Sequence, residues 1–112
     1  MVDMKEKLKE IKTLVKTTHG EYPELMEPLT ELYKRAEGDG ALSKKTKEII
    51  SVALSTASQC DWCIAYHVKR ALDAGATKDE LIEACFVSTL IFGTSAWMYI
   101  GSVLKAIEEH GK

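Results

Sequence analysis

Two cysteines separated by two residues, Cys60 and Cys63, are followed four residues later by His67. On a helix, at about 100° per residue, these three side chains lie on one stripe, and residues four apart can touch. If the helix starts near Cys60, both thiols lie in its first turn, where the helix dipole and unpaired backbone N–H groups favour a thiolate. The spacing therefore predicts a reactive dithiol with an imidazole beside it.

Glu48, twelve residues before Cys60, is the candidate partner of His67. If the two flanking helices form an antiparallel hairpin that turns at residues 58–59, a rise of about 1.5 Å per residue brings Glu48 and His67 to nearly the same level. A carboxylate beside an imidazole fixes its tautomer and raises its basicity, so that the imidazole can accept a proton from a thiol. We therefore predict a Glu48–His67–Cys63 proton relay, with Cys60 placed to resolve an oxidised Cys63.

The same residue types allow other interpretations. Cys, His and Glu are also zinc ligands, but no second CxxC or His pair completes a usual zinc spacing. Haem attachment is excluded because Ile64, and not a histidine, follows Cys63. We expect neither a metal nor a cofactor. Which cysteine attacks first stays open from the residues alone, since the dipole favours Cys60 and the spacing to His67 favours Cys63.

Helical periodicity dominates the chain, and no stretch alternates as a strand does. It predicts an all-α fold of six helices, with an antiparallel hairpin of the third and fourth helices holding the site. The expected helices cover about residues 4–18, 23–37, 43–57, 60–74, 77–90 and 95–109. Pro23 suits the first turn of the second helix, and Thr77 with Glu80 has the spacing of a capping box.

Length and composition narrow the class of protein. A chain of 112 residues has room for one domain, residues 1–112. Apolar residues make up 46% and charged residues 29%, and the net charge of −2 without a basic stripe argues against nucleic-acid binding. The N-terminal segment has no apolar signal region, so the three cysteines suggest reduced thiols in the cytoplasm.

The stretch 84–104 contains no charged residue and is long enough to span a bilayer. Its five Ser and Thr residues and two glycines argue instead for two helices that meet near Gly93, and we expect no membrane span. Since one small core cannot hide so much apolar helix, we expect a homo-oligomer. Cys85 is predicted to be a core residue, and Phe92 or Trp97 could line an apolar approach to the site.

The motifs together resemble the AhpD-like alkylhydroperoxidases of the carboxymuconolactone decarboxylase superfamily. The similarity consists of Glu48, the CxxC pair and His67 at their spacing, and it extends over most of the chain, from about Tyr22 to Ala106. Three flanking sequence segments also resemble the family, and these are Leu42–Glu48, Cys63–His67 and Ala74–Ala84. Decarboxylase members of the superfamily lack the cysteine pair, which argues against lactone decarboxylation here.

The resemblance implies an all-helical protein that assembles as trimers or hexameric rings. It implies that Cys63 is the peroxide-attacking thiolate and Cys60 the resolving partner, with His67 and Glu48 as the proton relay. A hydroperoxide substrate and a dithiol or disulfide electron donor protein are then the expected partners. The well-known peroxidase members have a second His between the cysteines, where this chain has Trp62. This departure keeps open a non-catalytic oligomeric module that senses redox state or binds a metal or small molecule.

Overall fold

The computed structural model describes residues 2–111, in which helices are joined by short loops and no strand occurs. Its helices are α1 (Met4–Glu21), α2 (Pro23–Glu37), α3 (Lys44–Ala57), α4 (Asp61–Asp73), α5 (Lys78–Phe92), α6 (Thr94–Met98) and α7 (Ile100–His110). The predicted all-α fold is confirmed. The sixth expected helix is divided at Tyr99, whose backbone N–H bonds the carbonyl of Ala96, three residues back, in a tighter turn than an α-helix makes.

The first expected helix also ends later than predicted. Gly20 stays within α1, and the helix ends at Glu21, with Tyr22, the residue before Pro23, as its C-cap. A residue that precedes proline is disfavoured in the helical region of backbone conformation, and proline is well suited to begin the next helix. Proline, and not glycine, therefore sets the boundary between α1 and α2.

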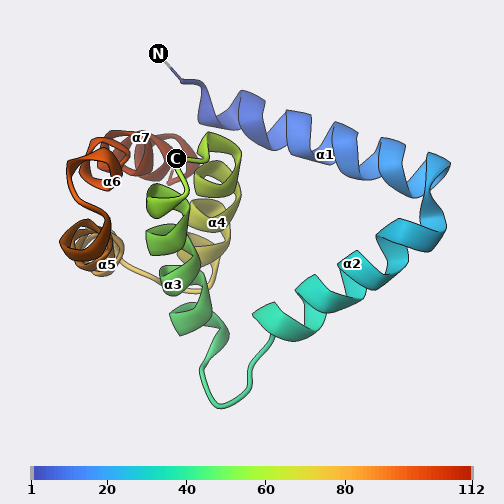
Figure 1. Cartoon of the computed structure of the whole chain (residues 1–112), viewed down its shortest axis with the longest axis horizontal. Coiled ribbons are helices and arrows are strands. Elements are labelled where there is room, and N and C mark those ends of the chain that lie inside the picture. Colours follow the sequence, from blue (N-terminus) through green and yellow to red (C-terminus); the bar gives the residue numbers. More distant parts are fainter. Residues whose placement is uncertain (1, 112) are drawn as a thin grey trace.

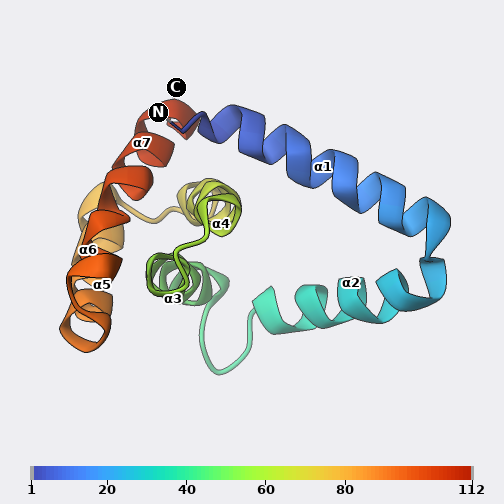
Figure 2. The same ribbon diagram turned by 45° about the horizontal axis from the view of Figure 1, so that its top comes forward.

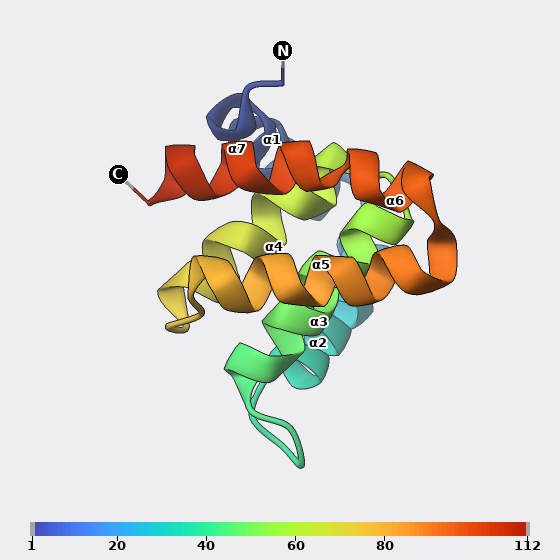
Figure 3. The same ribbon diagram turned by 90° about the vertical axis from the view of Figure 1, so that its left-hand side faces the viewer.

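Helices α3 and α4 lie side by side as an antiparallel hairpin (Figures 1 and 2). The turn between them uses Gln59 at φ 56°, a left-handed conformation, and the Cys60 N–H bonds the carbonyl of Ser55. Helices α5 and α7 cross one face of this hairpin (Figure 3). On the opposite side, α1 and α2 extend away from the body as an arm, and α2 returns toward α3 (Figure 1).

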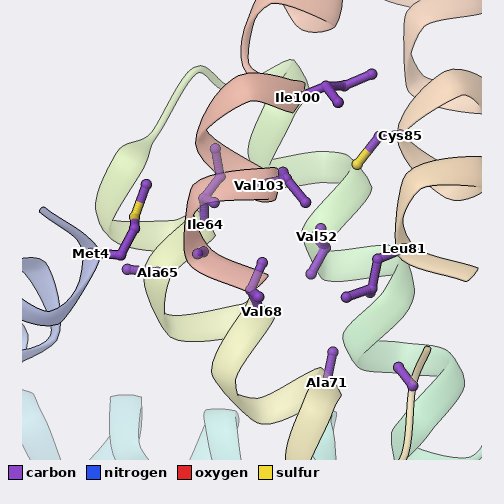
Figure 4. Packing of buried hydrophobic residues seen from close by; sticks show 12 residues of the cluster. Met4, Val52, Ile64, Ala65, Val68, Ala71, Leu81, Cys85, Ile100 and Val103 are labelled. Carbon is purple, nitrogen blue, oxygen red and sulfur yellow. The ribbon is translucent and has the colours of Figure 1, made fainter. Parts of the chain in front are cut away.

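The core lies where α3, α4, α5 and α7 meet (Figure 4). Val52 of α3, Val68 of α4, Leu81 of α5 and Val103 of α7 are fully buried there. Cys85 is fully buried as well, and burial raises the pKa of its thiol to about 11. The prediction that Cys85 is a core residue is confirmed, and the thiol stays protonated and apart from the CxxC pair.

The uncharged stretch is only partly buried. Leu90 is 84% exposed and Ile91 77% exposed, with Phe92 and Trp97 about half exposed beside them. Within residues 2–111, no helix combines the length and apolar character needed to cross a bilayer. Covering of this surface by a second copy of the chain remains a prediction.

The capping box that opens α5 allows a direct test of the local sequence analysis. The Thr77 hydroxyl accepts from the Glu80 N–H at 3.1 Å, and the Glu80 carboxylate accepts from the Thr77 N–H at 2.9 Å. Thr77→Ala is expected to lower the free energy of unfolding by about 1 kcal/mol, measured by urea denaturation. The exposed Thr17→Ala in the interior of α1 is the control, and it should be neutral or slightly stabilising.

Candidate active site

The cysteine pair lies at the N-terminus of α4, where the sequence placed it. Cys60 is the N-cap of α4, and its Sγ accepts a hydrogen bond from the Cys63 N–H at 3.1 Å. The two Cα atoms are 5.2 Å apart, and the sulfurs are joined in a disulfide. The sequence suggested reduced thiols, whereas the structure shows the oxidised form of the pair. A redox dithiol must reach both forms in each cycle.

Glu48 and His67 meet across the α3–α4 hairpin. His67 Nδ1 lies 2.8 Å from Glu48 Oε1, and Glu48 is fully buried. Because an ionised carboxylate only accepts, Nδ1 of the neutral imidazole carries the hydrogen and Nε2 is left as the proton acceptor. His67 lies one helical turn after Cys63, and both line the same pocket.

The second oxygen of Glu48 is occupied by an arginine that the sequence analysis did not single out. Arg70 Nε donates to Glu48 Oε2 at 3.0 Å. Burial alone would raise the pKa of the Glu48 carboxyl, but the hydrogen bonds from His67 and Arg70, together with the neighbouring Glu37 carboxyl, outweigh burial. The pKa of Glu48 is therefore lowered well below its ordinary value, and the carboxylate stays charged beside His67.

Glu37, the last residue of α2, is the other functional candidate that sequence reasoning missed. Its Oε2 lies 2.7 Å from Arg70 Nε, and the residue is only 8% exposed. Burial and the neighbouring Glu48 carboxyl raise the pKa of Glu37. Two acidic side chains from α2 and α3 thus converge on one arginine from α4.

A pocket of about 590 Å³ opens between the arm and α4. Its lining is almost wholly apolar and uncharged. The lining residues are Ile11, Leu14, Val15, Thr18, His19, Met26, Leu29, Thr30, Tyr33, Trp62, Cys63, Tyr66 and His67. Neither Phe92 nor Trp97, the residues proposed from sequence to line an apolar approach, belongs to it. They lie on the other side of the body, on α5 and α6, whereas α1 and α2 form this wall (Figure 2).

Trp62, which lies between the two cysteines, is attached to α1. The Lys7 ammonium lies 4.0 Å from the centre of its ring, and the indole N–H donates to Glu10 Oε1 at 3.3 Å. The indole also lines the pocket and is 48% exposed. Trp62 therefore connects the CxxC segment to the arm.

The described residues offer no evident metal site. Within residues 2–111, no three or more His, Cys, Asp or Glu side chains converge so as to hold a metal ion. The chemistry available here is that of a dithiol, an imidazole oriented by a buried carboxylate, and an apolar pocket that reaches Cys63.

The fold and the site together define an all-helical protein with a CxxC pair at a helix N-terminus. Residues 23–106 match the carboxymuconolactone decarboxylase family, and the chain belongs to that family. It is 38% identical over 78 residues to an uncharacterised protein of the cox locus of Paracoccus denitrificans, with 70% of each chain covered. It is 31% identical over 102 residues to an uncharacterised protein of Cupriavidus necator, with 91% of this chain and 90% of that one covered.

Solved structures and a more distant relative agree with this assignment. A carboxymuconolactone decarboxylase family protein from Legionella pneumophila, solved in its apo form, superposes with a TM-score of 0.94 at 38% identity over 97% of each chain. The protein TM1620 from Thermotoga maritima gives 0.85 at 25% identity, over 94% of this chain and 92% of that one. The alkyl hydroperoxide reductase AhpD of Mycobacteroides abscessus is 29% identical over 58 residues, which are 52% of this chain and 33% of that protein. The resemblance to AhpD-like proteins is thus confirmed.

The lowered pKa of Glu48 predicts a loss of stability in acid. A carboxyl with a depressed folded-state pKa stabilises the fold above its ordinary value, 4.5, and this contribution disappears as the pH falls toward the folded value, about 2. We expect the free energy of unfolding of the wild type, relative to Glu48→Gln, to fall by roughly 3 kcal/mol between pH 6 and pH 2. Urea denaturation of both proteins across this range measures the difference, and a constant difference would contradict the prediction.

Proposed function

We propose that this protein is a dithiol-dependent hydroperoxide reductase. The observation that supports the proposal most is the convergence of the CxxC pair and the Glu48–His67 hydrogen bond on one pocket. Family membership alone does not choose between activities. The cysteine pair favours redox chemistry, and the distant similarity to an alkyl hydroperoxide reductase agrees with it.

The proposed reaction begins at Cys63. His67 Nε2 accepts the thiol proton, and the thiolate attacks the outer oxygen of the hydroperoxide. An S–O bond forms, the O–O bond breaks, and the leaving alkoxide takes a proton from His67 to give an alcohol. The Cys60 thiol then attacks the sulfenic acid, forming the disulfide and releasing water.

A dithiol donor completes the proposed cycle by reducing the Cys60–Cys63 disulfide through exchange. The net change is one hydroperoxide and one donor dithiol converted to an alcohol, water and a donor disulfide. Such a donor requires a reducing compartment, for which the cytoplasm is our proposal. The uncharged pocket wall favours a hydroperoxide with an apolar body over a charged one.

Trp62 supports a second candidate function. A tryptophan between the cysteines, held to α1 by Lys7 and Glu10, suits a module that changes with the redox state of the pair without turnover. The two candidates differ in kinetics, because only a peroxidase consumes hydroperoxide in amounts beyond one equivalent per chain.

The test is hydroperoxide reduction coupled to NADH, with lipoamide-type or thioredoxin-type donors, using cumene hydroperoxide as the apolar substrate. We expect multiple turnovers with at least one donor. Formation of the Cys60–Cys63 disulfide in one equivalent, without turnover under any donor, would favour the sensing module instead.

A further inference from the structure

Arg70 lies between two acidic residues and can satisfy only one of them through Nε. Its Nε is 3.0 Å from Glu48 Oε2 and 2.7 Å from Glu37 Oε2. An arginine Nε carries a single hydrogen, and the hydrogen bond goes to Glu48. Both carboxyl oxygens of Glu37 are buried without a hydrogen-bond donor.

This arrangement fixes the orientation of Glu48. Oε1 accepts from His67 and Oε2 accepts from Arg70, so the carboxylate cannot rotate without losing one bond. Arg70 is itself held from the other side, since its guanidinium lies 5.3 Å from the centre of the Tyr66 ring, four residues earlier on α4. Arg70 thus acts on His67 through Glu48.

Glu37 lies in a place that disfavours a negative charge. It is the last residue of α2, where the helix dipole opposes an anion, and it faces the Glu48 carboxylate. Lys47 Nζ donates to the Gly38 carbonyl at 2.6 Å, and this bond holds the end of α2 against α3. The titratable and charged groups around the pair are Tyr33 and Glu37 from α2, Glu48 from α3, and Tyr66, His67 and Arg70 from α4.

A proton on Glu37 removes the conflict, since a protonated carboxyl donates where a carboxylate only accepts. The Glu48 carboxylate is an acceptor beside it, since Oε2 of both residues lies within 3.0 Å of the same Arg70 Nε. Two acidic groups that meet in a buried site share one proton in this way, because both cannot be charged at low cost.

We propose that Arg70 and Glu37 are positioning residues of the relay: Arg70 holds the Oε2 side of Glu48, and Glu37 shares a proton with it, so that Glu48 stays charged and directed at His67. Neither residue lines the pocket that reaches Cys63. The catalytic consequence rests on the proposed function. The effect on the reactivity of the Cys63 thiol does not, since that reactivity is measured without a hydroperoxide.

The first test follows the rate at which iodoacetamide alkylates Cys63 in the reduced protein as a function of pH, read by mass spectrometry. Arg70→Met is expected to move the midpoint of this profile to higher pH and to slow alkylation at pH 7 about tenfold, because Glu48 then loses the donor that holds Oε2 and part of what keeps the carboxylate charged. Arg70→Lys keeps the positive charge and should recover part of the loss. Lys69→Met is the matched control, since Lys69 forms only an exposed ion pair with Asp73 on the same helix. An Arg70→Met profile that coincides with that of Lys69→Met would overturn the proposal.

Glu37 is tested by two variants of similar size. Glu37→Gln retains a donor for Glu48 and is expected to keep the midpoint, whereas Glu37→Leu removes the donor and should move it upward. Glu31→Gln is the control, because Glu31 pairs with Arg35 on the exposed face of α2. If Glu37→Gln shifts the midpoint as far as Glu37→Leu does, Glu37 acts as a carboxylate and not as a donor. The proposal of a shared proton would then be wrong.

Folding is controlled separately, since Arg70→Met removes the cation that the two buried acidic groups share. The double variant Glu37→Gln/Arg70→Met removes one of these acidic groups, and circular dichroism reports whether each variant is folded. A folded double variant with the wild-type alkylation profile would also overturn the role of Arg70. If the profiles shift as expected but no donor supports turnover, the positioning residues stand and the peroxidase proposal fails.

Discussion

Cys63→Ser is expected to lower hydroperoxide turnover by about 10³-fold or more, to the rate of the uncatalysed reaction. A serine hydroxyl is not ionised near neutral pH and is a far weaker nucleophile toward a peroxide oxygen than a thiolate. Cys60→Ser should also stop steady turnover, but it should leave the first attack intact. The coupled NADH assay measures both variants against the wild type.

The order of the two cysteines follows from trapping the intermediate. In Cys60→Ser, one equivalent of hydroperoxide should leave a sulfenic acid on Cys63, which dimedone labels for mass spectrometry. Cys85→Ala is the matched control for loss of a thiol outside the site, and turnover per folded molecule should be unchanged. Label on Cys60 in the Cys63→Ser variant would reverse the assignment, as the position of Cys60 at the end of the helix dipole allows.

The sequence predicted the fold well because its signals are local. Apolar periodicity, the proline at position 23, the Thr77 capping box and the cysteine at the start of α4 each act within one or two turns of helix. The helical rise along an antiparallel hairpin also predicted that Glu48 and His67 would lie at the same level. In the structure His67 Nδ1 lies 2.8 Å from Glu48 Oε1. A short turn leaves little freedom in the register of two helices, so this long-range contact follows from local lengths.

Contacts that depend on the path of the whole chain could not be predicted in this way. Glu37 reaches Arg70 only because α2 returns to the hairpin after the bend at Tyr22 and Pro23, and no periodicity encodes that direction. The same bend makes α1 and α2 the wall of the pocket, in place of Phe92 and Trp97. Arg70 did leave a signal, since it lies three residues after His67 on the same stripe of α4.

Glu48→Gln is expected to lower kcat for hydroperoxide reduction by about 10²- to 10⁴-fold while changing the size of the site very little. The reason lies in Arg70, which only donates and so requires an oxygen opposite Nε. The glutamine amide satisfies Arg70 with its oxygen and must then present its NH₂ group to His67 Nδ1. His67 becomes the acceptor at Nδ1 and carries its hydrogen on Nε2, the tautomer that cannot take a proton from Cys63.

This explanation makes a prediction that simple loss of charge does not. In Glu48→Gln/Arg70→Met, Arg70 no longer competes for the amide oxygen, which can then accept from His67 Nδ1 and restore the productive tautomer. The double variant should therefore be no slower than Glu48→Gln alone, and up to about tenfold faster, although each single change is harmful. Measuring kcat for all four members of the cycle decides between the two explanations. If the loss in kcat of the double variant equals the product of the losses of the two single variants, the reaction requires the charge of Glu48 and not the tautomer of His67.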